Sequence, residues 1–102
     1  MDKVGRRKAI WKKTNGVCAH CGKRTGATKQ TIDHFIPKSW GGTYDQRNLL
    51  PLCQSCNWER KNEFVNPWKY YTFAPKQEIL KCLSYRREWE LRTCSMYDAM
   101  TA

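Results

Sequence analysis

Two Cys-x-x-Cys pairs constrain this chain more than any other feature of its sequence. Cys18 and Cys21 form the first pair, Cys53 and Cys56 form the second, and residues 22–52 lie between them. Four cysteines in two such pairs are typical of a closed tetrahedral zinc site, whereas a redox dithiol needs only one pair. Four thiolates leave no open position for water, so we expect a structural zinc that ties a knuckle to a later helix.

The length of the chain suits a single domain, residues 1–102. A domain of this size buries little surface and often needs a metal or disulfides for stability. The N-terminus lacks the apolar region of a signal peptide, and no stretch approaches the ~20 apolar residues of a membrane span. We therefore expect a cytoplasmic protein with reduced thiols and no membrane partner.

The charge of the chain is strongly positive, with 19 Lys and Arg against 9 Asp and Glu, a net charge of +10. Solubility alone would account for such a charge. A polyanionic partner would account for it as well, because clustered Lys and Arg release counterions from phosphates when they bind nucleic acid. The composition favours the second explanation.

The pattern of residues predicts an α+β domain with a hairpin at its centre. β-branched and aromatic residues favour a strand over 29–36, and a second short strand follows over 48–52, with Pro51 at an edge. We expect helices over 5–13, over 55–64 with Ser55 as N-cap, and over 75–93, where an apolar stripe that includes Cys82 as a core residue recurs at steps of three or four. The predicted core covers about 15–65, between flanking helices.

An Asp-His pair on the first predicted strand begins a longer motif. The order of its parts resembles the HNH endonucleases, and the match runs from Cys18 to about Asn62. The parts are Asp33-His34, Ile36-Pro37, Gly41-Gly42, Asn48-Leu49 and Leu52-Cys53-x-x-Cys56-Asn57, with Lys61 four residues further on. This resemblance implies a ββα-metal (His-Me finger) core, here clipped by a four-cysteine zinc site.

The resemblance also implies roles for four polar residues. His34 matches the family's general base, Asp33 and Asn57 match ligands of the catalytic divalent metal, and Asn48 matches the residue that holds the loop across the hairpin. The position of Asn57 is often His in the family; with Asp and Asn, two oxygen ligands favour Mg²⁺ or Mn²⁺. A histidine with a pKa of ~6.5 suits the activation of water for phosphodiester hydrolysis. The implied products are 5′-phosphate and 3′-hydroxyl ends.

Two hypotheses for function follow. The first is a metal-dependent DNA endonuclease of phage or mobile-element type, acting on double-stranded DNA, either with a partner protein or as a homodimer. The second is a non-catalytic, zinc-stabilised DNA-binding module, in which Asp33 and His34 form a core pair and Asn57 caps a helix. In both, four basic residues are candidates for phosphate contact: Lys38, Arg47, Arg60 and Lys61.

Alternation along the strand makes one further prediction about the Asp-His pair. Successive side chains on a strand point to opposite faces, so Asp33 and His34 would face apart if the strand were regular. We therefore expect irregular backbone geometry towards Pro37.

Overall fold

A two-stranded hairpin lies at the centre of the fold in a computed structural model, which describes the backbone of residues 3–101 and the side chains of residues 4–93. Strands β1 (Thr31–His34) and β2 (Leu49–Leu52) are antiparallel. Thr31 lies opposite Leu52 and His34 lies opposite Leu49. Both strands fall within the predicted segments, and the α+β class is confirmed.

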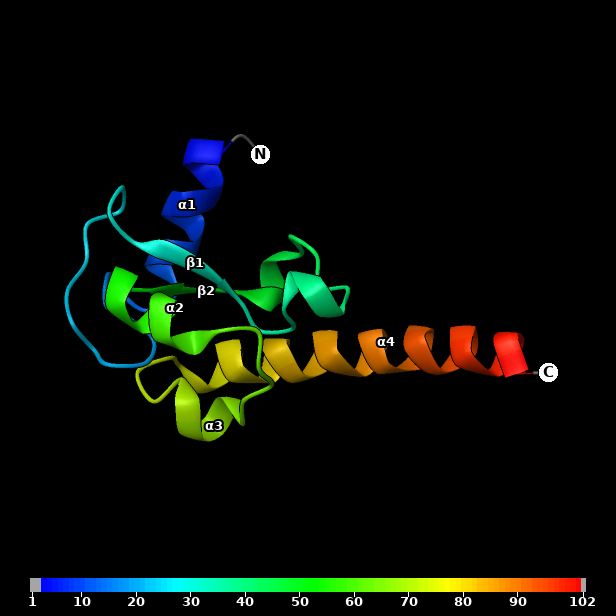
Figure 1. Ribbon diagram of the computed structural model, residues 1–102. Helices are drawn as coiled ribbons and strands as arrows, with labels where there is room; N and C mark the ends of the chain where they lie inside the picture. Colours follow the sequence, from blue (N-terminus) through cyan, green and yellow to red (C-terminus); the bar gives the residue numbers. More distant parts are fainter. Residues whose placement is uncertain (1–2, 102) are drawn as a thin grey trace.

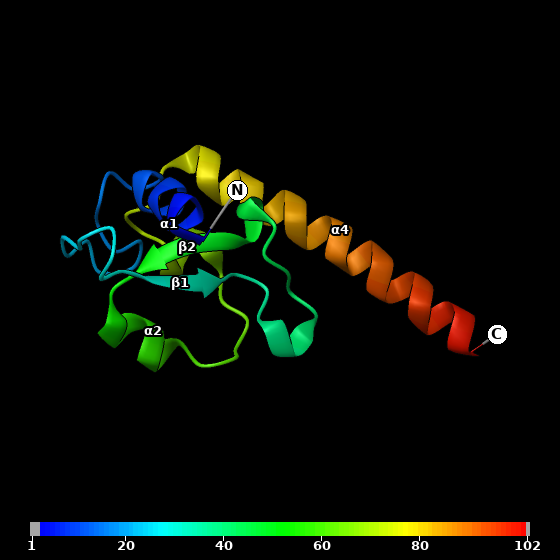
Figure 2. The same ribbon diagram turned by 90° about the horizontal axis from the view of Figure 1, so that it is seen from above.

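Within residues 3–101, four helices surround the hairpin: α1 (Lys3–Lys12), α2 (Gln54–Arg60), α3 (Pro67–Tyr70) and α4 (Lys76–Thr101). Helices α1 and α2 lie on opposite sides of the hairpin, and α4 runs past it and projects beyond the rest of the molecule (Figures 1 and 2). Two 3-10 turns, η1 (Lys38–Trp40) and η2 (Gln46–Asn48), interrupt the loop between the strands. The hairpin and the helix α2 that follows it form the ββα arrangement that the resemblance to HNH endonucleases implied.

Two helices differ from their predicted bounds. Helix α2 begins directly after Cys53, its N-cap residue, so Ser55 lies inside the helix and does not cap it. The helix ends at Arg60, before the predicted residue 64, because Lys61 has a φ of 56° and leaves the helical conformation. Helix α4 continues past residue 93 to Thr101, since no Gly or Pro follows Pro75. Among the described residues, no helix is both long and apolar enough to cross a membrane.

The core packs between the hairpin, the cysteine knuckle and the first half of α4. Its largest fully buried side chains include Tyr71 and Tyr85, all four residues of β2, and Phe35 and Ile36, which directly follow β1. Cys82 is fully buried on α4, as its place in the apolar stripe predicted. Ile10 of α1 is also fully buried, which fixes the N-terminal helix against β2.

The loop between the strands is held in one shape by Gly42 and Asn48. A Cβ atom on Gly42 would lie 1.7 Å from the Ile36 carbonyl oxygen, so only glycine fits. The buried Asn48 side chain accepts a hydrogen bond from the Ile36 amide (2.7 Å) and donates to the carbonyls of Ile36 and Thr43 (3.1 Å each). These contacts fix the loop across the hairpin, and with it the positions of Lys38 and Tyr44.

Candidate active site

The four cysteines of the two Cys-x-x-Cys pairs meet at one point in the fold. Their Sγ atoms all lie within 4.8 Å of one another, and those of Cys21 and Cys53 are 3.8 Å apart. A tetrahedral zinc with Zn–S bonds of ~2.3 Å requires sulfur atoms ~3.8 Å apart. Gly22 turns the knuckle with a φ of 78°, which aims both of its cysteines at this point. The donor set and its geometry fit a structural zinc.

The ionisation of these thiols also fits a cation-binding site. Burial opposes the ionisation of Cys53, but hydrogen bonds from Cys56 and the other thiols outweigh it and lower the pKa of Cys53 to about 7. Burial raises the pKa of Cys56. The thiolate of Cys53 is therefore available near neutral pH, and metal binding would release the proton that Cys56 otherwise keeps. Burial raises the pKa of Cys82 to about 12, and this thiol lies outside the cluster.

A small pocket of about 150 Å³ opens between the end of β1 and α2. It brings together three residues that the sequence predicted as catalytic, Asp33, His34 and Asn57. The backbone is irregular after His34, as predicted, but β1 itself keeps its regular pairing through His34. The lining residues are Ile32, Asp33, His34, Pro37, Lys38, Asn57, Lys61 and Asn62.

Asp33 is almost fully buried, with 4% of its surface exposed. Its Oδ2 atom accepts a hydrogen bond from the Tyr71 hydroxyl (2.5 Å) and lies 3.4 Å from Arg60 Nε. Burial raises the pKa of Asp33, and Arg60 and Tyr71 oppose that rise by stabilising the carboxylate. Tyr71 and Arg60 are thus part of the site, and no motif in the sequence indicated this role.

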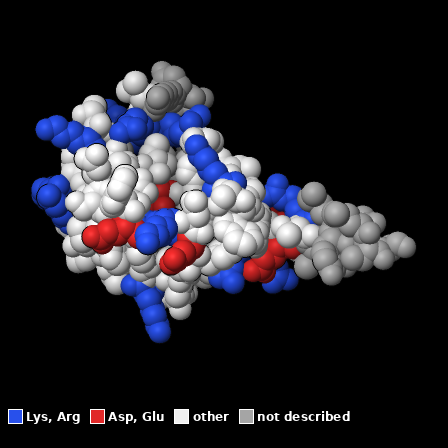
Figure 3. Space-filling view, in the orientation of Figure 1, with Lys and Arg blue, Asp and Glu red and all other residues white. Residues whose placement is uncertain are grey.

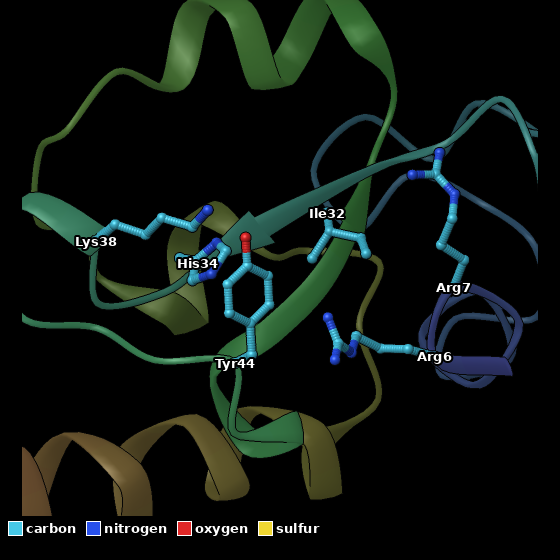
Figure 4. Close-up of a pocket in the computed structure, with 6 residues that line it drawn as sticks. All are labelled: Arg6, Arg7, Ile32, His34, Lys38 and Tyr44. Carbon is cyan, nitrogen blue, oxygen red and sulfur yellow. The ribbon is translucent and has the colours of Figure 1, made fainter. Parts of the chain in front are cut away.

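His34 is half-buried at the end of β1, beside the ring of Tyr44 (Figure 4). The two ring centroids are 4.8 Å apart and the rings are nearly perpendicular, at 82°. Burial, and then the positive charge of Lys38, lower the pKa of His34 to about 4. Its Nε2 atom is covered from solvent and has no hydrogen-bond partner among the described residues. The imidazole is therefore neutral at pH 7, with one ring nitrogen not committed to the protein.

The four predicted phosphate contacts divide into two groups. Lys38 and Lys61 line the small pocket. Arg47 instead pairs with Asp45 (2.8 Å) and with Glu88 of α4 (2.6 Å). Arg60 is 4% exposed, and its Nη2 atom donates to the Phe35 carbonyl at 3.0 Å. Both arginines therefore stabilise the fold around the site, and their guanidinium groups are already engaged.

Comparison with known families agrees with this geometry. A family model described as HNH endonuclease matches residues 18–69, about half of the chain. The chain belongs to the HNH endonuclease family. The HNH match takes in both cysteine pairs, the hairpin, α2 and part of α3. Helices α1 and α4 lie outside the matched residues.

Two curated relatives are much longer proteins than this chain. The chain is 26% identical over 77 residues to "CRISPR-associated endonuclease Cas9" of Actinomyces naeslundii, which covers 74% of this chain and 7% of the relative. It is 26% identical over 76 residues to the Cas9 endonuclease of Corynebacterium diphtheriae, with the same coverage of both proteins. The chain thus spans only a small part of the length of these relatives.

The backbone of Lys61 leads to a prediction about this HNH pocket. Its φ of 56° and ψ of −165° lie in a region that only glycine adopts readily, at a cost of ~1–3 kcal/mol for other residues. We expect Lys61→Gly to raise the free energy of unfolding by about that amount and to slow DNA cleavage, because the pocket loses a cation. Lys61→Ala is the matched control, since it removes the charge but keeps the strain. Urea unfolding in which the two variants are equally stable would contradict the strained conformation.

Proposed function

We propose that this chain is a metal-dependent HNH endonuclease that hydrolyses phosphodiester bonds in double-stranded DNA. The observation that carries the proposal is the single pocket shared by Asp33, His34 and Asn57. In the proposal the whole chain, residues 1–102, acts as one HNH domain around the core and works with a partner protein or as a homodimer in the cytoplasm of a phage-infected or bacterial cell. A structural Zn²⁺ bound by the four cysteines clips the ends of the hairpin together.

His34 is the proposed general base. A base must be deprotonated before it can accept a proton from the attacking water, and the lowered pKa of His34 leaves it neutral at working pH. The ring of Tyr44 packs against the imidazole and orients it. The Nε2 atom has no hydrogen-bond partner among the described residues, so no carboxylate binds it. The residue is therefore ready to accept a proton without first losing one.

The titration of His34 tests this arrangement. Because the folded pKa lies below the unfolded value of ~6.5, the contribution of neutral His34 to stability should fall as the pH drops from about 6.5 towards 4. Lys38→Met should raise the pKa of His34 but leave it below 6.5, because burial is the larger cause. The measurement is an NMR titration without added divalent metal in a His20→Gln background, which leaves one imidazole signal. A His34 pKa near 6.5 in the protein that keeps Lys38 would refute the proposed burial of this imidazole.

Asp33 and Asn57 are the proposed ligands of the catalytic divalent ion. Carboxylate and amide oxygens suit Mg²⁺ or Mn²⁺, which keep several waters and bind only one or two protein groups. When bound, such an ion stabilises negative charge on the reacting phosphate and the leaving oxygen. Tyr71 and Arg60 hold the Asp33 carboxylate in place and oppose the rise in its pKa that burial causes.

Lys38 and Lys61 are the proposed phosphate-binding cations of the pocket. Both line it, and neither forms an ion pair among the described residues. Their charges attract a DNA strand and hold its phosphate beside His34, which supplies the positioning on which phosphoryl chemistry depends. Lys and Arg side chains gather around α1 at the top of the face in Figure 3, and acidic side chains lie across its middle and lower part.

One observation favours a second function, a DNA-binding module without turnover. Asp33 has little exposed surface and two partners in the protein, which is also how a purely structural carboxylate would look. In that case DNA would still bind to the basic surface, but it would not be cleaved in the presence of any divalent ion.

The chemistry of the product ends tests the proposed reaction. A duplex labelled at one 5′ end is incubated with zinc-loaded protein and Mg²⁺ or Mn²⁺, and the labelled products are sized beside markers with 3′-hydroxyl and 3′-phosphate ends. We expect products with 3′-hydroxyl ends. Products with 3′-phosphate ends would contradict the proposed direction of bond cleavage.

A further inference from the structure

We propose that a second pocket, on the side of His34 that faces α1, binds a phosphodiester group adjacent to the one that is cut. This pocket has a volume of about 390 Å³ and is lined by Arg6, Arg7, Ile32, His34, Lys38 and Tyr44 (Figure 4). The inference rests on the proposed function and extends it, because it assigns to the substrate strand a binding site to which Arg6 and Arg7, outside the HNH match, contribute.

The charges of the pocket select an anion. Three cationic side chains line it, and no carboxylate does. Arg7 is held by the protein, since its Nη2 atom donates to the carbonyls of Thr28 (3.2 Å) and Gln30 (2.5 Å). Arg6 makes no ion pair or side-chain hydrogen bond among the described residues, and its guanidinium lies over the ring of Tyr44. The guanidinium donors of Arg6 are therefore available to a ligand.

Tyr44 holds the two outer cations at the pocket. The Cζ atom of Arg6 lies 4.9 Å from the centroid of the Tyr44 ring, and the Nζ atom of Lys38 lies 4.5 Å from it. In Figure 4 the ring stands between Arg6 on one side and Lys38 and His34 on the other. Two like charges that share one ring repel each other, and an anion bound in the pocket offsets that repulsion.

The position of the pocket indicates a polynucleotide phosphate. The larger and the smaller pocket share Ile32, His34 and Lys38, so they adjoin at His34. Phosphates follow one another along a strand at a rise of ~3.4 Å per nucleotide, so a strand whose reacting phosphate is beside His34 carries its neighbour towards Arg6. Arg6 belongs to α1, outside the HNH match over residues 18–69. The N-terminal helix thus contributes a substrate-binding residue of its own.

Binding of a fluorescent duplex to zinc-loaded protein tests this site without any cleavage. Anisotropy is measured over a range of salt concentrations with no added divalent metal, for wild type, Arg6→Ala and Lys8→Ala. Lys8 is the matched control, because it is an exposed cation on the same helix that does not line the pocket. Zinc content and circular dichroism confirm that each variant is folded.

We expect Arg6→Ala to weaken binding by about tenfold, the effect of one charge-assisted contact. The slope of log K against log salt should become shallower by about 0.9, the value for one phosphate contact. Arg6→Lys should recover most of the slope, and Lys8→Ala should keep the wild-type slope. Equal losses in Arg6→Ala and Lys8→Ala, or a wild type that does not bind duplex, would overturn the site. If Arg6→Ala loses the contact, Lys8→Ala does not, and the wild-type protein cuts no DNA with any divalent metal, then the phosphate site stands and the nuclease proposal fails.

Discussion

Replacing His34 by alanine is expected to slow DNA cleavage by roughly 10²–10⁴-fold, the usual contribution of a general base. The fold should survive, because His34 is only half-buried and lies outside the cysteine cluster. DNA affinity should change little, since the lowered pKa leaves His34 uncharged at neutral pH. Added Mn²⁺ should not restore the rate, because the variant lacks a proton acceptor and keeps both proposed metal ligands.

The other histidine of the chain supplies the control for this prediction. His20 lies away from the pocket, where its Nδ1 atom is 2.7 Å from the Tyr70 carbonyl oxygen and its ring stacks on Tyr70. His20→Ala should therefore cut at the wild-type rate. Single-turnover nicking of a plasmid, with zinc content and duplex binding measured on the same preparations, separates loss of chemistry from loss of structure. Equal rates for His34→Ala and wild type would remove His34 from the mechanism.

Replacing Cys53 by serine is expected to unfold the domain at room temperature. Binding of a structural zinc contributes on the order of 10–16 kcal/mol, as much as the whole stability of a small domain. Cys53 is also the cysteine whose pKa of about 7 makes its thiolate available to the metal near neutral pH. Its loss should separate the knuckle from the hairpin and remove the cooperative unfolding transition.

Cys82→Ala is the control for the zinc prediction, because Cys82 is a fully buried thiol outside the cluster. This variant should keep one zinc per chain and lose only about 1 kcal/mol of stability, the cost of a small core truncation. Zinc content by atomic emission and thermal unfolding by circular dichroism measure both effects. A Cys53→Ser protein with native circular dichroism and unchanged thermal stability would contradict the zinc assignment.

Local sequence signals predicted the parts of the fold that depend on neighbouring residues. The hairpin followed from two β-branched segments, and the cysteine cluster followed from the spacing of its two pairs. The place of Cys82 in the core followed from its position on the apolar stripe of α4. In each case a pattern of residue types or spacings along the chain carries the signal, even where, as in the cysteine cluster, the residues that meet are far apart in the sequence.

Side-chain contacts between distant segments that no motif marks could not be predicted from the sequence. Tyr71 reaches Asp33 across 38 positions of the chain, and Arg47 meets Glu88 of α4 across 41. Arg47 and Arg60 looked like surface cations in the sequence, but tertiary partners engage both of them. Arg6 and Tyr44 carried no motif, and only the packing of α1 beside the loop brings them to His34.

The most direct test of the central claim is the conversion of supercoiled plasmid by zinc-loaded wild-type protein, with and without Mg²⁺ or Mn²⁺. His34→Ala, purified in the same way, reports any contaminating nuclease. The account predicts nicked or linear plasmid only with wild type and only when the divalent ion is added. Plasmid that is bound but remains supercoiled with every divalent ion would contradict the account and support the non-catalytic DNA-binding module.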